Sequence, residues 1–151
     1  MRLLCTLFIL VLSLFGCATL PPNSEIIQFY EVSTPKPYDD VLHEAEGAIA
    51  EHNFRITGHS RVGKVIRERG AANFPDSDTI QFCNLTHART LLEMSPTWVK
   101  YMPCNLVIYQ YQGKTFVRTH LLPTDSENAE LNAFSGKMNQ MLKEIVDFAV
   151  E

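Results

Sequence analysis

The sequence lacks a basic patch: 13 lysine and arginine residues stand against 17 aspartate and glutamate residues, for a formal net charge of −4. A moderately acidic chain without a run of basic residues offers no electrostatic surface to a phosphate backbone, so we expect no nucleic-acid partner. The GxSxG, HExxH, P-loop and dinucleotide-binding motifs are also absent, and with them the spacings that mark those hydrolases, zinc proteases and nucleotide-binding folds. The sequence therefore points to no particular reaction and leaves any cofactor unknown.

Cysteine is scarce, and no two cysteines have the CxxC spacing of a metal-binding or redox motif. The four are Cys5, Cys17, Cys83 and Cys104. The first two fall in the N-terminal region considered next, which leaves two thiols for the folded domain. Two thiols in an oxidising compartment are candidates for a disulfide.

The N-terminal region has the pattern of an export signal. An uncharged apolar run extends from Leu3 to Phe15 behind Arg2, and it falls short of the roughly 20 residues that a membrane-spanning helix needs. This pattern predicts a signal peptide over residues 1–16. The run ends in the letters LFGC, residues 14–17, which resemble the box that precedes the lipidated cysteine of bacterial lipoproteins.

The sequence therefore predicts a lipid on Cys17, a tether over residues 17–24 and one folded domain over residues 25–151. Each buried methylene of an acyl chain contributes about 0.8 kcal/mol, so the lipid would make the membrane a firm partner. We expect a protein of the cell envelope. Ala18, and not an aspartate, follows the cysteine predicted to be lipidated. By the sorting rules of bacterial lipoproteins, this favours the outer membrane, facing the periplasm, if the source is Gram-negative.

The folded domain shows alternating helical and strand patterns. A helical stripe begins at Tyr38, and the residues from Cys104 to Tyr111 are apolar on both alternating faces, which is typical of a central strand. Gln112-Gly113 fits a tight hairpin turn. Thr124 and Glu127 form a capping-box pattern before a long final helix. These signals predict an α+β domain in the order β-α-β-α-β-α-β-β-α, with helices packed on a single sheet of about five strands.

Several short patterns together resemble a known family. Residues 54–56 precede His59, Cys83-Asn84 leads into a helix, and residues 101–104 (YMPC) open an apolar strand that ends in a hairpin. This arrangement resembles the domain of unknown function 302 family over roughly residues 27–125. The resemblance implies a small α+β domain that tends to dimerise, so a homodimer is among the expected partners. It implies no established activity, and Leu85 stands where the family pattern has a proline after the Cys-Asn pair.

Five residues form the candidate pocket: His59, Cys83, Asn84, His87 and Cys104. Asn84 is the expected helix cap, and a thiol at a helix start together with an imidazole can ligate zinc, iron or copper or react as a nucleophile. Cysteine is also among the most buried residue types and often only packs. A disulfide or buried pair, a ligand or redox pocket, and a metal or haem site therefore all remain open, and no metal ligands are assigned.

The direction of the two strands that carry the cysteines decides whether a disulfide can form. Cys83 ends one strand and Cys104 begins the next strand in the sequence. A parallel crossover, which the intervening helix favours, would separate the two residues by roughly 16 Å, whereas a disulfide spans at most about 7 Å between Cα atoms. Antiparallel strands would bring them together. The sequence thus favours the parallel arrangement and disfavours the bond.

These observations support one main interpretation and one alternative. The main one is a lipid-anchored envelope protein that binds a small ligand or a protein partner through the Cys83 and Cys104 end of its sheet. The alternative is a thiol- or metal-dependent redox enzyme that uses Cys83 with His59 or His87. Whether the protein is an enzyme stays open at this point.

Overall fold

The computed structural model describes residues 27–151, so the predicted signal peptide, lipidation site and tether all lie outside the described residues. The elements follow the predicted order, with one added 3-10 helix. They are β1 (Gln28–Thr34), α2 (Tyr38–Glu51), β2 (Arg55–Ser60), α3 (Val62–Glu68), β3 (Ser77–Cys83), α4 (Leu85–Met94), η1 (Pro96–Tyr101), β4 (Cys104–Tyr111), β5 (Lys114–Leu121) and α5 (Ala129–Val150). The predicted α+β class and its single sheet are confirmed.

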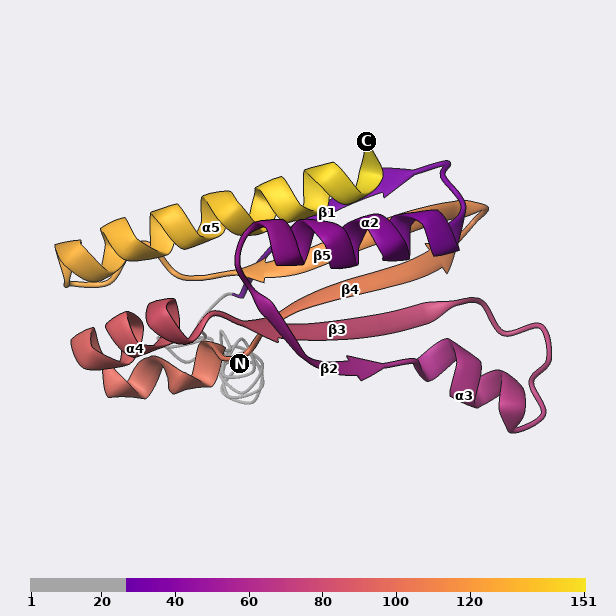
Figure 1. Cartoon of the computed structure of the whole chain (residues 1–151), viewed down its shortest axis with the longest axis horizontal. Coiled ribbons are helices and arrows are strands. Elements are labelled where there is room, and N and C mark those ends of the chain that lie inside the picture. The colour runs from indigo at the N-terminus through magenta and orange to yellow at the C-terminus, as the bar shows by residue number, and fades with distance from the viewer. Residues whose placement is uncertain (1–26) are drawn as a thin grey trace, which may run out of the picture.

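The five strands form one sheet in the order β1-β5-β4-β3-β2, and every neighbouring pair is antiparallel. β4 occupies the centre, as its two apolar faces predict. The expected parallel crossover between β3 and β4 is wrong. α4 and η1 lie at the end of the sheet where β3 stops, so the chain re-enters from that same end and β4 runs in the opposite direction (Figure 1).

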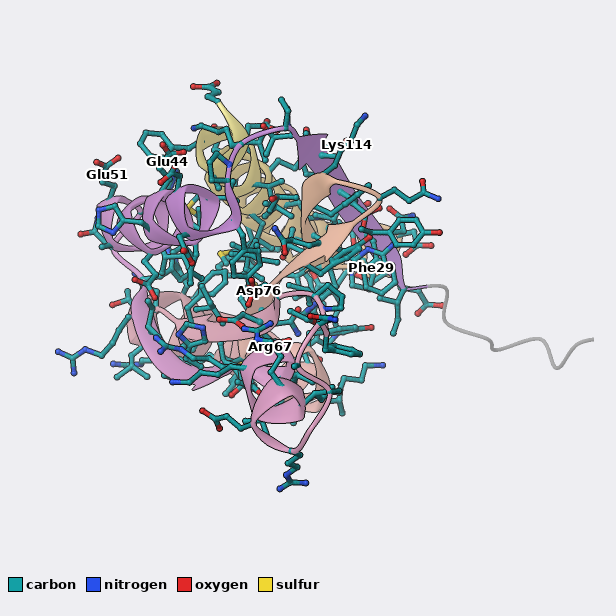
Figure 2. The ribbon with its side chains drawn as sticks, turned by 90° about the vertical axis from the view of Figure 1, so that its right-hand side faces the viewer. Phe29, Glu44, Glu51, Arg67, Asp76 and Lys114 are labelled. Carbon is teal, nitrogen blue, oxygen red and sulfur yellow. The ribbon has the colours of Figure 1, made fainter. Side chains whose placement is uncertain are left out.

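α2 and α5 lie side by side across one face of the sheet and bury the core beneath them (Figure 1). Their apolar stripes face the sheet because residues three and four apart share one side of a helix. The most enclosed residues come from both layers: Val41, Ala45, Ile49, Ile80, Phe82, Leu106, Ile108, Val117, Leu142 and Ile145. In Figure 2, Glu44 and Glu51 lie on the helical side of the molecule, whereas Phe29 lies on the opposite side of the sheet.

α5 begins later than its sequence pattern suggests. The cap is Asn128, whose Oδ1 accepts hydrogen bonds from the N–H groups of Glu130 and Leu131 at 3.0 and 3.1 Å. The segment before it follows the side of α5 instead of starting the helix, because the amide of Asn139 bonds both backbone groups of Leu122 at 2.8 Å. Asparagine is a more favourable cap than threonine, and the bonds from Asn139 hold the preceding segment outside the helix.

Among the described residues, no helix is both long enough and apolar enough to span a bilayer.

Candidate functional site

A pocket lies at the end of the sheet where β3 stops and β4 starts, with α4 and α5 on either side. It has a volume of about 350 Å³, including its open mouth. Its wall is mainly apolar and combines residues from five separate stretches of the chain. The lining residues are Phe54, Cys83, Asn84, His87, Ala88, Leu91, Tyr101, Met102, Cys104, Leu122, Phe134 and Met138. Four of the five predicted site residues thus line one cavity.

Asn84 fixes the start of α4 at the pocket rim. Its side-chain oxygen accepts hydrogen bonds from the N–H groups of Thr86 at 2.9 Å and His87 at 3.2 Å. Its side-chain nitrogen donates to the carbonyl of Asn53 at 3.0 Å, which ties the rim to the turn before β2. The predicted capping role of Asn84 is confirmed. Two N–H groups at the helix start are therefore already paired within the chain.

The two cysteines reach the pocket from the facing ends of β3 and β4. Phe82 lies opposite Cys104 in the antiparallel ladder, so Cys83 is one residue beyond that pair. Both thiols are free. Burial, and then the nearby charge of Cys83, raises the pKa of Cys104 to about 12, and burial raises the pKa of Cys83. Both groups are therefore protonated near neutral pH, and a protonated thiol is a poor nucleophile and a poor metal ligand.

His87 forms part of the aromatic wall of the pocket. Its ring centre lies 6.1 Å from that of Phe54 and 6.2 Å from that of Phe134. The imidazole therefore packs between rings from two separate parts of the chain. Nowhere in residues 27–151 do three or more histidine, cysteine, aspartate or glutamate side chains converge as a metal site. The pocket has the chemistry of an apolar binding site with a few polar groups.

His59 does not line this pocket, which corrects the expectation that it shares a cavity with Cys83. In the antiparallel pairing of β2 with β3, His59 lies opposite Ile80, three residues before Cys83 and therefore about 10 Å along the strand. Its Nε2 is 2.7 Å from Oδ2 of Asp78. Its Nδ1 is 3.7 Å from Oε1 of Glu46. The histidine belongs to a separate polar cluster under α2.

The residues that the sequence left out of the site come from several elements, and three of them belong to α5 and η1. Phe134 and Met138 are one helical turn apart, so both face the pocket, but the same spacing also marks an ordinary core stripe. Tyr101 lines the pocket and makes an edge-to-face contact with Trp98, with ring centres 4.9 Å apart. Only the packing of α5 against the sheet end shows which of these core residues border a cavity.

Comparison with known proteins gives a family and a fold. The family model described as "Domain of unknown function DUF302" matches residues 30–149. A crystal structure of an uncharacterised conserved DUF302 protein from Bacillus stearothermophilus superimposes with a TM-score of 0.70, at 19% sequence identity, over 82% of this chain and 98% of that chain. At this identity the structural likeness supports the fold alone. No curated protein matches the chain.

Proposed function

The chain belongs to the DUF302 family, and from that premise we propose that it is an envelope protein that binds a small, mainly apolar ligand between α4 and α5. The observation that carries the proposal is the pocket itself, which opens to solvent although apolar side chains form most of its wall. Water contacts the apolar wall of the open pocket, and a bound ligand could cover that apolar surface. Burying that surface is favourable by roughly 25 cal/mol per Å².

The polar groups of the pocket support binding rather than catalysis. Burial keeps the thiols of Cys83 and Cys104 protonated, and Asn84 already occupies two N–H groups of the helix start. His87 and Tyr101 are the other titratable side chains in the wall, and both pack against aromatic rings. The ligand that fits this chemistry is uncharged and mostly hydrocarbon, with at most one polar end to meet Asn84 or His87 at the rim.

The N-terminal pattern supports the cellular placement of this binding site. An apolar run behind Arg2 and a lipoprotein-like box ending at Cys17 suit a chain that is exported and held at a membrane by lipid. A lipid-anchored domain would meet apolar compounds that partition into that membrane. The proposed ligand class and the proposed location therefore agree.

A titration with toluene tests the binding proposal. Trp98 is the only tryptophan in the chain and contacts Tyr101 in the pocket wall, so its fluorescence reports on the pocket. Toluene should change that fluorescence saturably and should shift the backbone NMR signals of α4. Ala88 lines the pocket, and Ala88→Leu should fill it and weaken toluene binding at least about tenfold, which corresponds to roughly 1.4 kcal/mol.

The matched control is Ala50→Leu, which adds the same side chain at an exposed position of α2. Alanine and leucine are both good helix formers, so neither replacement should disturb the helix that carries it. The control should bind toluene like the unmodified protein. A non-saturable response, or equal affinity in the Ala88→Leu variant, would overturn the proposal.

A further inference from the structure

We propose that Cys83 and Cys104 form a reversible disulfide in the wall of the pocket, and that this bond weakens ligand binding. The effect on ligand rests on the proposed function above. Formation of the bond does not, because it follows from the positions of the two cysteines alone.

The strand register places the two residues within reach of each other. Phe82 lies directly opposite Cys104, and residues opposite one another in an antiparallel pair have Cα atoms about 4.5–5.5 Å apart. Cys83 is one residue further along β3, about 3.3 Å away, so its Cα lies roughly 6 Å from that of Cys104. Disulfides span about 4.4–6.8 Å between Cα atoms. No backbone rearrangement of β3 or β4 is needed to bring the cysteines into range.

The two side chains also reach the same space. Both line the pocket, although alternate residues of a regular strand point to opposite faces. Cys83 can line the same pocket because it is the last residue of β3, where the chain leaves the strand and turns into α4. The two thiols are close enough that the charge of Cys83 helps to raise the pKa of Cys104. Both thiols are free, so neither is already committed to another disulfide.

The reaction is thiol–disulfide exchange with a small-molecule disulfide such as oxidised glutathione. The more exposed thiol, Cys83, loses its proton and attacks one sulfur of the oxidant, which releases one glutathione and leaves a mixed disulfide. Cys104 then loses its proton and attacks Sγ of Cys83, which releases the second glutathione. The protein loses two hydrogen atoms in total, and one disulfide is reduced to two thiols.

The effect on ligand follows from where the new bond lies. Cys83 ends β3 and Cys104 begins the neighbouring strand β4, and both side chains line the pocket. A disulfide holds its two sulfurs at about 2.05 Å, well inside the distance between non-bonded atoms, which is about 3.5–4.0 Å. The two sulfurs therefore move toward each other, which changes the surface that the pocket presents to a ligand. Oxidation should therefore weaken toluene binding, and reduction should restore it.

The test uses the full-length chain with Cys5→Ser and Cys17→Ser, so that only the two pocket thiols remain. After treatment with oxidised glutathione, the intact protein should lose the mass of two hydrogen atoms, and a peptide map should show Cys83 linked to Cys104. Dithiothreitol should reverse the change. Because the bond closes a loop of about 20 residues, the melting temperature should rise by roughly 10 °C on oxidation.

A matched variant, Cys83→Ser, leaves Cys104 alone in the pocket and should show neither the mass loss nor the rise in melting temperature. Two outcomes would overturn the disulfide: a glutathione that stays attached to Cys83, or two thiols that both remain open to alkylation. A disulfide that forms without changing toluene affinity would overturn the proposed effect on ligand. If the reduced protein does not bind toluene but the disulfide forms, the proposed function fails and the disulfide stands.

Discussion

Nε2 of His59 lies 2.7 Å from Oδ2 of Asp78, and this contact gives a buried carboxylate a hydrogen-bonding partner beside Tyr38. Asp78 is only 5% exposed and sits on β3 beneath α2. The other ring nitrogen of His59 faces Glu46 of α2 at 3.7 Å. The imidazole thus bridges the sheet and the helix that covers it. This polar contact lies apart from the ligand pocket and has a different role.

The first prediction is that His59→Ala destabilises the fold and leaves the pocket intact. The variant leaves Asp78 buried without its imidazole partner, which should cost about 3 kcal/mol of unfolding free energy in urea. Toluene affinity should not change. His43→Ala, at an exposed position of α2, is the control and should stay within about 0.5 kcal/mol. Loss of toluene binding at unchanged stability would instead place His59 in the pocket.

The second prediction concerns the central strand. Leu106 and Ile108 on β4 are fully buried against the helices. Replacing either with alanine should lower the unfolding free energy by about 2–5 kcal/mol, because the change removes buried methylenes and leaves a cavity. Val107→Ala, on the opposite and partly open face of β4, should cost less. A loss below about 0.5 kcal/mol at Leu106 would contradict the central position of this strand.

Elements defined by local chemistry were predictable from the sequence. Asn84 has a short side chain that caps a helix, and it does so at α4. Gln112 and Gly113 both have positive φ, at 49° and 75°, and they form the two-residue loop of the β4–β5 hairpin. β4 is apolar on both faces and lies at the centre of the sheet. Each of these outcomes depends on residues close together in the chain.

Features that depend on distant contacts were not predictable in this way. β3 and β4 are antiparallel because α4 packs at the end of the sheet where β3 stops. The sequence of α4 alone does not specify where this helix packs. The start of α5 depends on Asn139 reaching back to Leu122. His59 pairs with Asp78 because β2 and β3 share a register interrupted between Ile56 and Gly58. Sequence spacing therefore grouped His59 with Cys83, whereas the register separates them.

The third prediction concerns membrane attachment. If Cys17 carries lipid, radiolabelled fatty acid should be incorporated into the full-length protein and should be lost in Cys17→Ser. The variant should also leave the membrane fraction, since the acyl chains supply the anchoring free energy. Cys5→Ser is the control and should keep both the label and the location. An unmodified, uncleaved chain in the cytoplasm would contradict the anchor.

The fourth prediction concerns acid stability and His120 on β5. Burial lowers the pKa of His120 from its usual 6.5, because an imidazolium loses hydration there. The unfolded chain therefore takes up a proton below pH 6.5 that the folded chain still excludes. This group should make stability fall as the pH drops below 6.5, by no more than about 1.4 kcal/mol per pH unit.

Urea unfolding should be measured across this pH range. The unfolding free energy of His120→Gln should fall less steeply toward acid pH than that of the unmodified protein. The neutral amide keeps hydrogen-bonding groups near the carbonyl of Tyr101 and the side chain of Asn105, which His120 faces at 3.4 and 3.2 Å. A second variant, His43→Gln on the exposed side of α2, retains His120 and should show the same pH dependence of stability as the unmodified protein. An unchanged slope in His120→Gln would contradict the assignment.

The fifth prediction concerns alkaline stability and the pocket thiols. The folded pKa of Cys104 is raised from its usual 9.0 to about 12, first by burial and then by the charge of Cys83. A raised pKa means that the folded chain keeps a proton that the unfolded chain releases above pH 9.0. Stability from this group is therefore complete below pH 9.0 and is lost as the pH rises toward about 12. The direction is opposite to that of His120.

The difference between the unmodified protein and Cys104→Val isolates this contribution, because the other alkaline groups are common to both. In urea unfolding with reductant present, the unmodified protein should lose stability relative to the variant as the pH rises above 9.0, by at most about 1.4 kcal/mol per pH unit. Valine fills the buried site with an apolar side chain that has no proton to release. A pH-independent difference between the two proteins would show that the Cys104 thiol is not shielded from solvent, and the raised pKa assigned to it would then be wrong.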